Sequence, residues 1–336
     1  CVLTRKISQT PFENVANVDS LAENALTIVS EGLKKRILHT NAKTVFVGLS
    51  GGLDSTLALL ICVRAFDILK KDRKDIFAVT MPCFGTTVRT RTNADTLASK
   101  LGVSLQCVDI KNAVSVHFND ISQEENTFDA TYENAQARER TQVLMDMAGK
   151  AGGFVVGTGD MSELVLGWAT FNGDHMSMYG VNAGMPKTFV RTLVQYEAKR
   201  QGDKELQKTL LDVLATPVSP ELLPTNSQGE QAQKTEDLVG SYLLHDFFIY
   251  NALRNEFSPK KVYRLACIAF KGQFDNEEIL KWLKVFYKRF FAQQFKRNCC
   301  PDGVAVFDFS LSPRSGFVMP SDGVGKLWQE QLDEIK

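Results

Sequence analysis

The sequence lacks three features that mark large classes of proteins. Its 39 basic and 39 acidic side chains cancel, so no positive excess favours a nucleic-acid surface. Its longest apolar runs, such as STLALLICV, fall far short of the roughly 20 residues of a membrane span. No secretory signal pattern opens the chain. We therefore expect neither a nucleic-acid partner nor a membrane.

The cysteines lack the spacing of a metal site or a redox pair. Seven are present, and no Cys-x-x-Cys occurs among them. Cys62, Cys107 and Cys267 stand in apolar runs, which predicts reduced core residues. Adjacent Cys299 and Cys300 have no second pair with which to bind zinc. This usage favours a reducing, cytoplasmic location.

Apolar runs alternate with amphipathic segments over the first half of the 336 residues. We expect a helix over 21–38, capped by Asp19 or Ser20. Such alternation predicts an α/β fold with a doubly wound, mostly parallel sheet, whose ligands sit at the carboxyl ends of the strands. The expected strands are 44–49, 76–82, 105–110 and 153–157, and the expected helices between them are 54–70, 92–101 and 131–150.

From residue 187 onward the pattern becomes mostly helical. Ser258 and Pro259 are typical of a helix start. The Pro-rich, polar stretch 216–237 is a long loop, and loops of this length are usually functional or disordered. We predict that it is mobile without ligand, together with the stretch after Gly167. The expected helices are 187–200, 203–215, 235–254, 259–271 and 275–297.

The first strand ends in the loop SGGLDS, which precedes an apolar helix. A strand, a glycine-rich turn and a helix N-terminus together direct backbone N–H groups at an anion. The loop has neither the lysine of a Walker A motif nor the glycine spacing of a Rossmann loop. A plain strand-to-helix turn with Asp54 as the N-cap is the alternative.

Ser50-Gly51-Gly52-x-Asp54-Ser55 resembles the pyrophosphate loop of the ATP pyrophosphatases. The resemblance implies an adenine nucleotide alpha hydrolase-like fold and cleavage of ATP between its α and β phosphates. It also implies adenylation of an acceptor oxygen, followed by displacement of AMP by a nucleophile. The absence of Cys-x-x-Cys counts against the members of this group that transfer sulfur.

A second group of polar residues follows the fourth expected strand, in GTGDMSELVLGW and the segment behind it. It contains Asp160, Glu163, Asp174, His175 and Lys187. Glu163 and Asp54 of the SGGLDS loop would lie at the ends of neighbouring strands. Two carboxylates that face a triphosphate suit Mg²⁺. A solvated acid that favours the helix dipole is the alternative for Glu163.

With this segment the chain resembles the synthetase domain of glutamine-dependent NAD⁺ synthetases over essentially its whole length. The segments that carry the resemblance are MPCFGTT, TYENAQARERTQVLMD, GTGDMSELVLGW, NGDHMSMYGVNAGMPKTFVR, SPELLP, LHDFF, QFKRNCCPDG and SLSPR. The resemblance implies that ATP adenylates the carboxylate of nicotinic acid adenine dinucleotide (deamido-NAD⁺). Ammonia then displaces AMP, and the products are NAD⁺, AMP and pyrophosphate.

The resemblance also assigns residues to this reaction. Asp54 and Glu163 correspond to acids that hold Mg²⁺. Asp174 and Lys187 correspond to catalytic groups, and the lysine is placed at the reacting phosphates. The ATP-binding positions are Gly48, Leu49, Ser50, Gly51, Gly52, Leu53, Asp54, Ser55 and Thr158. The deamido-NAD⁺-binding positions are Asn134, Glu163, Trp168, Ala169, Thr170, Phe171, Asp174 and Lys296.

Several of these residues have ordinary structural interpretations. Asp174 could accept a proton from attacking ammonia or anchor a loop through its own hydrogen bonds. For His175 we favour a structural role. Met81 stands beside the expected adenine site and could equally be a core methionine.

Full-length members of the resembled family carry an amidase domain before the synthetase. Only about 40 residues precede the first expected strand, fewer than the roughly 50 of a small domain. We expect residues 1–19 to be a lead-in from a missing amidase, 20–300 the synthetase domain and 301–336 a tail. The alternatives are a non-catalytic dinucleotide-binding fragment and another adenylating amidotransferase half. The resemblance also implies a homo-oligomer.

Overall fold

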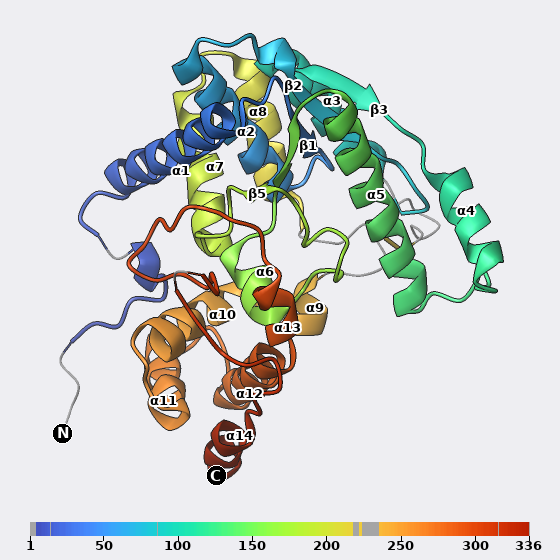
Figure 1. Ribbon diagram of the computed structural model, residues 1–336. Helices are drawn as coiled ribbons and strands as arrows, with labels where there is room; N and C mark the ends of the chain where they lie inside the picture. The colour runs from blue at the N-terminus through green and yellow to red at the C-terminus, as the bar shows by residue number, and fades with distance from the viewer. Residues whose placement is uncertain are drawn as a thin grey trace.

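A parallel five-stranded sheet forms the centre of the computed structural model (Figure 1). The structure describes residues 5–13, 15–85, 87–217, 222–223, 235–314 and 316–335. The strand order is β3-β2-β1-β4-β5, and every neighbouring pair runs parallel, as predicted. The strands are β1 (Val45–Gly48), β2 (Ile76–Thr80), β3 (Ser104–Cys107), β4 (Phe154–Gly157) and β5 (Tyr179–Gly180).

The central strands bury both faces, which explains their uninterrupted apolar sequences. Side chains alternate between two cores, because successive residues of a strand point to opposite faces. Val45 and Val47 of β1 belong to one core, and Phe46 belongs to the other. A shift of one residue in β1 would therefore exchange the residues of the two cores.

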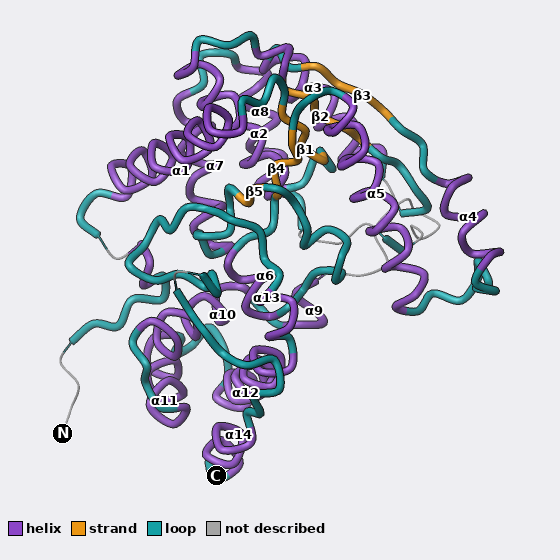
Figure 2. Tube along the Cα trace, in the orientation of Figure 1, coloured by secondary structure: helices purple, strands orange, loops and turns teal. Residues whose placement is uncertain are grey.

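Helices cover both faces of the sheet (Figure 2). On one face, the core with Val45 and Val47 is completed by α1 (Val18–Thr40), α2 (Leu53–Leu69), α3 (Val88–Leu101), α7 (Lys187–Arg200) and α8 (Lys204–Ala215). On the other face lie α4 (Lys111–Asp120) and α5 (Ala130–Lys150). The predicted doubly wound arrangement is confirmed.

The C-terminal part has a third core, which is rich in aromatic side chains. It lies below the sheet in Figure 1, and α6 (Met161–Leu166) from the sheet region packs into it. Phe12 of the short 3₁₀ helix η1 (Pro11–Glu13) joins the same core. The C-terminal helices that build this third core are α10 (Tyr242–Phe248), the π-helical η3 (Ile249–Arg254), α11 (Pro259–Ala269), α12 (Asn276–Ala292) and α14 (Lys326–Asp333).

Several boundaries differ from the expected ones. The helix expected over 235–254 breaks between α9 (Thr235–Val239) and α10, because Gly240 takes a φ of 92° and Ser241 caps a new helix, and α10 then continues directly into η3. The helix expected over 275–297 divides into α12 and α13 (Gln294–Asn298). The strand β5, the helix α4 and the 3₁₀ helix η2 (Arg73–Asp75) were not expected.

Two local predictions were wrong. Asn17, not Asp19 or Ser20, caps α1, and its side chain accepts a hydrogen bond from the Ser20 N–H at 3.0 Å. Cys107 is exposed because β3 is an edge strand, whereas Cys62 is buried and Cys267 half-buried. Ser258 and Pro259 do start α11. The predicted mobility of the 216–237 loop concerns mostly residues outside the described ones.

Among the described residues, no helix combines the length and apolar character that crossing a membrane requires.

Candidate active site

The loop after β1 turns sharply into α2 and folds around Ser50. Gly51 has a φ of 83°, and a Cβ atom there would lie 2.0 Å from the Thr90 carbonyl oxygen, so only glycine fits. The Gly52 N–H donates to Ser50 Oγ at 3.1 Å, and Ser50 Oγ lies 3.1 Å from Ser55 Oγ. Gly52 is the N-cap of α2 and offers no side-chain cap. The N–H groups of this helix end are therefore directed at the cavity, which suits an anion.

Asp54 lies in the first turn of α2, so the alternative of an N-cap aspartate is wrong. Its Oδ2 lies 2.7 Å from Lys187 Nζ, and its Oδ1 is buried without a hydrogen-bond partner among the described residues. A buried carboxylate oxygen without a donor is costly, and a bound cation would remove that cost.

Lys187 is the centre of the site. It is the first residue of α7, its side chain is 1% exposed, and its Nζ also lies 2.8 Å from Asp160 and 2.9 Å from Glu163. Burial alone would lower the pKa of Lys187, but the three carboxylates raise it well above its usual value. The ammonium therefore stays charged throughout the neutral range.

The two acids of α6 orient each other. The Glu163 N–H donates to Asp160 Oδ1 at 2.9 Å, and the Asp160 N–H donates to Glu163 Oε2 at 3.4 Å, which is a capping box. Burial raises the pKa of Asp160 to about 7 and that of Glu163 well above its usual value, against the attraction of Lys187. Glu163 is therefore part of a buried cluster and not the solvated acid of the alternative.

This carboxylate group fits a magnesium ion. One oxygen from each of Asp54, Asp160 and Glu163 lies within 4.8 Å of the others, and Mg²⁺ prefers carboxylate oxygens. Three carboxylates around one ammonium leave an excess of negative charge when all are ionised, which a divalent cation would neutralise. Asp160 was not among the predicted site residues, although the Asp-x-x-Glu spacing of a capping box was readable in the sequence.

The ends of β1 and β4 are joined by Asn182. Its side-chain amide donates to the Asp54 carbonyl oxygen at 2.9 Å and to the Thr158 carbonyl oxygen at 2.8 Å. Because β1 and β4 are neighbours, Asp54 and Glu163 lie close together, as expected. Asn182 was not predicted as a site residue, although it lies in the segment NGDHMSMYGVNAGMPKTFVR that contributed to the resemblance.

The predicted acceptor-binding residues surround the loop after α6. Lys296 donates to the carbonyl oxygens of Gly167 at 2.8 Å and Ala169 at 2.5 Å. The Thr170 N–H donates to Asp174 Oδ1 at 2.7 Å, and its hydroxyl donates to Asn134 Oδ1 at 2.8 Å. The structure therefore brings these side chains together, and Asp174 does anchor the loop.

Burial shifts both titratable groups of this loop toward their neutral forms. It raises the pKa of Asp174 and lowers the pKa of His175. His175 accepts a hydrogen bond from the Asn172 N–H at 3.0 Å and stacks on Phe171, with ring centroids 5.2 Å apart. These contacts favour the structural role for His175.

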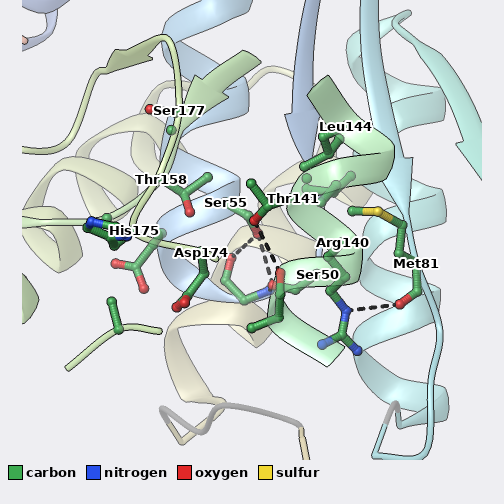
Figure 3. Close-up of a pocket in the computed structure, with 18 of the residues that line it drawn as sticks. Ser50, Ser55, Met81, Arg140, Thr141, Leu144, Thr158, Asp174, His175 and Ser177 are labelled. Carbon is green, nitrogen blue, oxygen red and sulfur yellow. Dashed lines mark hydrogen bonds between the residues drawn. The ribbon is translucent and has the colours of Figure 1, made fainter. Parts of the chain in front are cut away.

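A cavity of about 320 Å³ connects the two groups of residues. Figure 3 shows Ser50 and Ser55 near the centre of this cavity, with Thr158 on one side and Thr141 of α5 next to Ser55. Arg140 and Met81 also line the cavity, and Arg140 Nε donates to the Met81 carbonyl oxygen at 3.1 Å. The predicted residues that line it are Gly48, Leu49, Ser50, Gly52, Leu53, Asp54, Ser55, Thr158, Glu163, Ala169 and Asp174.

The remaining predicted residues do not line this cavity. Lys187 lies behind the carboxylates, and Gly51 faces Thr90. The others, which belong to the loop network or its surroundings, are Asn134, Trp168, Thr170, Phe171 and Lys296. Arg140 and Thr141 line the cavity but were not predicted, although both lie in the segment TYENAQARERTQVLMD that contributed to the resemblance.

Comparison with known proteins places this geometry in a family. Residues 25–210 match the family model described as NAD synthase. The glutamine-dependent NAD(+) synthetase of Mycobacterium leprae is 37% identical over 360 residues, which cover 99% of this chain and 52% of that protein. This chain thus spans about half the length of that relative.

Two solved structures share the fold. The glutamine-dependent NAD(+) synthetase of Cytophaga hutchinsonii superimposes with a TM-score of 0.76 at 19% identity, over 94% of this chain and 56% of that one. The NH3-dependent NAD synthetase of Campylobacter jejuni has a TM-score of 0.56 at 20% identity, over 84% of this chain and 96% of that one.

Proposed function

This chain belongs to the NAD synthase family, and we propose that it converts deamido-NAD⁺ to NAD⁺ with ATP and ammonia, releasing AMP and pyrophosphate. The observation that carries the proposal is the cluster of buried Lys187 with the cavity-lining acids Asp54 and Glu163 beside the loop after β1. An ammonium and several carboxylates at the end of a phosphate-type loop suit phosphoryl chemistry better than simple binding.

ATP occupies the part of the cavity nearest to α2. The N–H groups at the start of this helix and the hydroxyl groups of Ser50, Ser55 and Thr158 contact its phosphates. Asp54 and Glu163 would hold Mg²⁺, with Asp160 behind them, and a bound ion would supply positive charge that neutralises the phosphates.

In the first step, the carboxylate of deamido-NAD⁺ attacks the α-phosphorus of ATP. A new P–O bond forms, the bond between the α-phosphorus and the bridging oxygen breaks, and pyrophosphate leaves with the electron pair. Lys187 stabilises the negative charge that gathers on the phosphates in the transition state. Its buried carboxylate partners keep it protonated for this role.

In the second step, ammonia attacks the carbonyl carbon of the acyl-adenylate. A C–N bond forms, the C–O bond to AMP breaks, and AMP leaves with the electron pair. The nitrogen must lose a proton, and Asp174, whose pKa is raised by burial, accepts it. The acceptor binds on this side of the cavity, where the loop Trp168–Phe171 is held in place by Asn134 and Lys296.

Glutamine hydrolysis belongs to the amidase that longer members of the family carry, and ammonia is the donor that these 336 residues use directly. We further propose that the protein forms a homo-oligomer and acts in the cytoplasm. The longer relatives, of which this chain spans about half, support the partnership with an amidase.

The test supplies ATP, Mg²⁺ and deamido-NAD⁺ with either ammonium or ammonia-free glutamine, and measures NAD⁺ and AMP. We expect synthesis from ammonium alone, at a rate that rises with pH toward the pKa of ammonium, because only free ammonia attacks. Binding of deamido-NAD⁺ without AMP release would instead identify a non-catalytic dinucleotide-binding protein. AMP release with a different acceptor only would identify another adenylating amidotransferase.

A further inference from the structure

The short helix α10 lies against the start of α7 and places two side chains next to Lys187. Tyr242 and Asp246 are four residues apart, so they lie on one face of the helix. Both are buried, and both lie beyond the segment 25–210 that matches the family model. In Figure 1, α10 lies directly below α6 and α7. The C-terminal part therefore contacts the site from the side opposite the cavity.

Asp246 holds the first turn of α7 with one oxygen directly and with the other through Ser162 of α6. Oδ2 accepts a hydrogen bond from the Thr188 N–H at 2.8 Å, and Oδ1 accepts a short hydrogen bond from the Ser162 hydroxyl. Ser162 Oγ in turn accepts a hydrogen bond from the Lys187 N–H at 2.9 Å. The backbone of Lys187 is thus held to α6 and α10 at the same time.

These contacts replace the side-chain cap that α7 lacks at its start. Its N-cap is Pro186, which has no side-chain group that could accept from the first N–H groups of the helix. Ser162 and Asp246 accept from the first two of these N–H groups, and a carboxylate at this end also favours the helix dipole. Without Asp246, the start of α7 would keep only the Ser162 contact.

Tyr242 covers the ammonium on its remaining side. Lys187 Nζ lies 5.2 Å from the centre of the Tyr242 ring, within the range of a cation–π contact. The carboxylates of Asp54 and Glu163 lie toward the cavity. The ammonium is therefore fixed through both its backbone and its side chain.

We propose that Asp246 is a positioning residue for Lys187: it holds the start of α7 so that the ammonium stays fixed behind the carboxylates, from where its charge acts on the phosphates, while Tyr242 covers the ammonium on its other side. This inference rests on the proposed function. It assigns the C-terminal helices, which lie beyond the matched segment, a role in the reaction.

The kinetic test compares Asp246→Ala with Asp246→Asn. Alanine leaves the Thr188 N–H and the Ser162 hydroxyl without their partner, and we expect kcat to fall about tenfold to a hundredfold with KM for deamido-NAD⁺ within about twofold. Asparagine can still accept from Thr188 but can no longer accept through both oxygens, so kcat should fall less. A change confined to KM would overturn the proposal.

Asn251→Ala is the matched control. Asn251 is a buried polar residue of η3, and its amide donates to the Phe247 carbonyl oxygen at 2.9 Å, with no hydrogen bond to α7 among the described residues. We expect it to lower the melting temperature as Asp246→Ala does, while kcat stays within about twofold. Equal losses of kcat in the two variants would mean that Asp246 acts only through stability.

A double-mutant cycle tests the route through Lys187. In a Lys187→Ala background, Asp246→Ala should change kcat less than about twofold, because the group that it positions is gone. Additive effects would contradict a role that depends on Lys187.

A second measurement does not depend on activity. Acetic anhydride modifies exposed, unprotonated amines, so Lys187 should react slowly in the unmodified protein. In Asp246→Ala, mass spectrometry should detect about tenfold faster acetylation of Lys187, with that of Lys296 unchanged. Unchanged protection of Lys187 would overturn the positioning role even if the protein makes NAD⁺. Faster acetylation in a protein that makes no NAD⁺ would overturn only the proposed function.

Discussion

The sheet region, residues 18–215, and the C-terminal region, residues 235–335, contribute differently to the site. The sheet region supplies the groups that touch the cavity, such as Ser50, Asp54 and Glu163. The C-terminal region supplies groups that hold those residues in place, namely Asp246 behind Lys187 and Lys296 behind the loop after α6. The comparison indicates that chemistry and positioning are divided between two packed units, because preorganised charges need support from outside their own loop.

The largest expected effect lies in the sheet region. Lys187→Ala should lower kcat about a hundredfold to a thousandfold, because it removes a buried charge that acts on the transition state. KM for deamido-NAD⁺ should change much less. Steady-state kinetics with varied deamido-NAD⁺ provides the measurement. A rise in KM alone would move Lys187 from catalysis to binding.

We expect the three acids around Lys187 to differ in how their substitution changes the Mg²⁺ dependence of the rate. Asp54→Asn and Glu163→Gln should each lower turnover about tenfold to a hundredfold and raise the Mg²⁺ concentration that gives half-maximal rate, because both line the cavity. Asp160→Asn should lower kcat about tenfold without that shift, since Asp160 is fully buried behind the lysine. Magnesium titrations of the rate, with circular dichroism as a control for folding, distinguish the two responses. The same shift in all three variants would make Asp160 a metal ligand.

We expect the C-terminal region to make the protein less stable at acid pH. Burial lowers the pKa of His245 to about 4, and its Nε2 donates to the Val239 carbonyl oxygen. Its ordinary pKa is 6.5, so the unfolded chain binds a proton that the folded chain does not, and stability is lost as pH falls from about 6.5 toward 4. The loss amounts to about 3 kcal/mol at most.

His245→Gln keeps a donor for Val239 but removes the titration. Urea unfolding between pH 4 and 7 should therefore give a flatter stability profile for this variant than for the unmodified protein. Parallel profiles would show that His245 does not contribute to the pH dependence.

The sheet could be predicted from the sequence, whereas the supporting contacts could not. β1 and β2 are apolar on both faces, and the loop after β1 carries its own signature, so local sequence suffices for both. The division of 235–254 was also readable, since Gly240 and Ser241 are a helix end and a helix cap. β5 has only two residues and is a strand only because β4 lies beside it.

The candidate site shows the same limit. Asp160 had a local signal in its spacing to Glu163, whereas Asp246 was marked only by its place in LHDFF, one of the segments that carry the resemblance. Asp246 is 58 residues from Thr188, and their hydrogen bond depends on how α10 packs against α7. Chemistry near a strand end can be predicted from local motifs, but the second layer of support depends on tertiary packing.

The smallest expected effect concerns Lys296, the second residue with which the C-terminal region holds the site in place. Lys296 makes two hydrogen bonds to carbonyl oxygens of the loop after α6, and that loop carries the proposed acceptor-binding residues. Lys296→Met keeps most of the apolar stem but removes both hydrogen bonds, so we expect KM for deamido-NAD⁺ to rise about tenfold.

The value of kcat should stay within about threefold, because the loop can still reach its bound position once the acceptor supplies the missing contacts. Lys288→Met, on the exposed side of α12, is the control and should leave both constants unchanged. A fall in kcat without a rise in KM would place Lys296 with Asp246 as a support of catalysis. The C-terminal region would then position the reacting groups at both ends of the cavity and leave acceptor recognition to the sheet region.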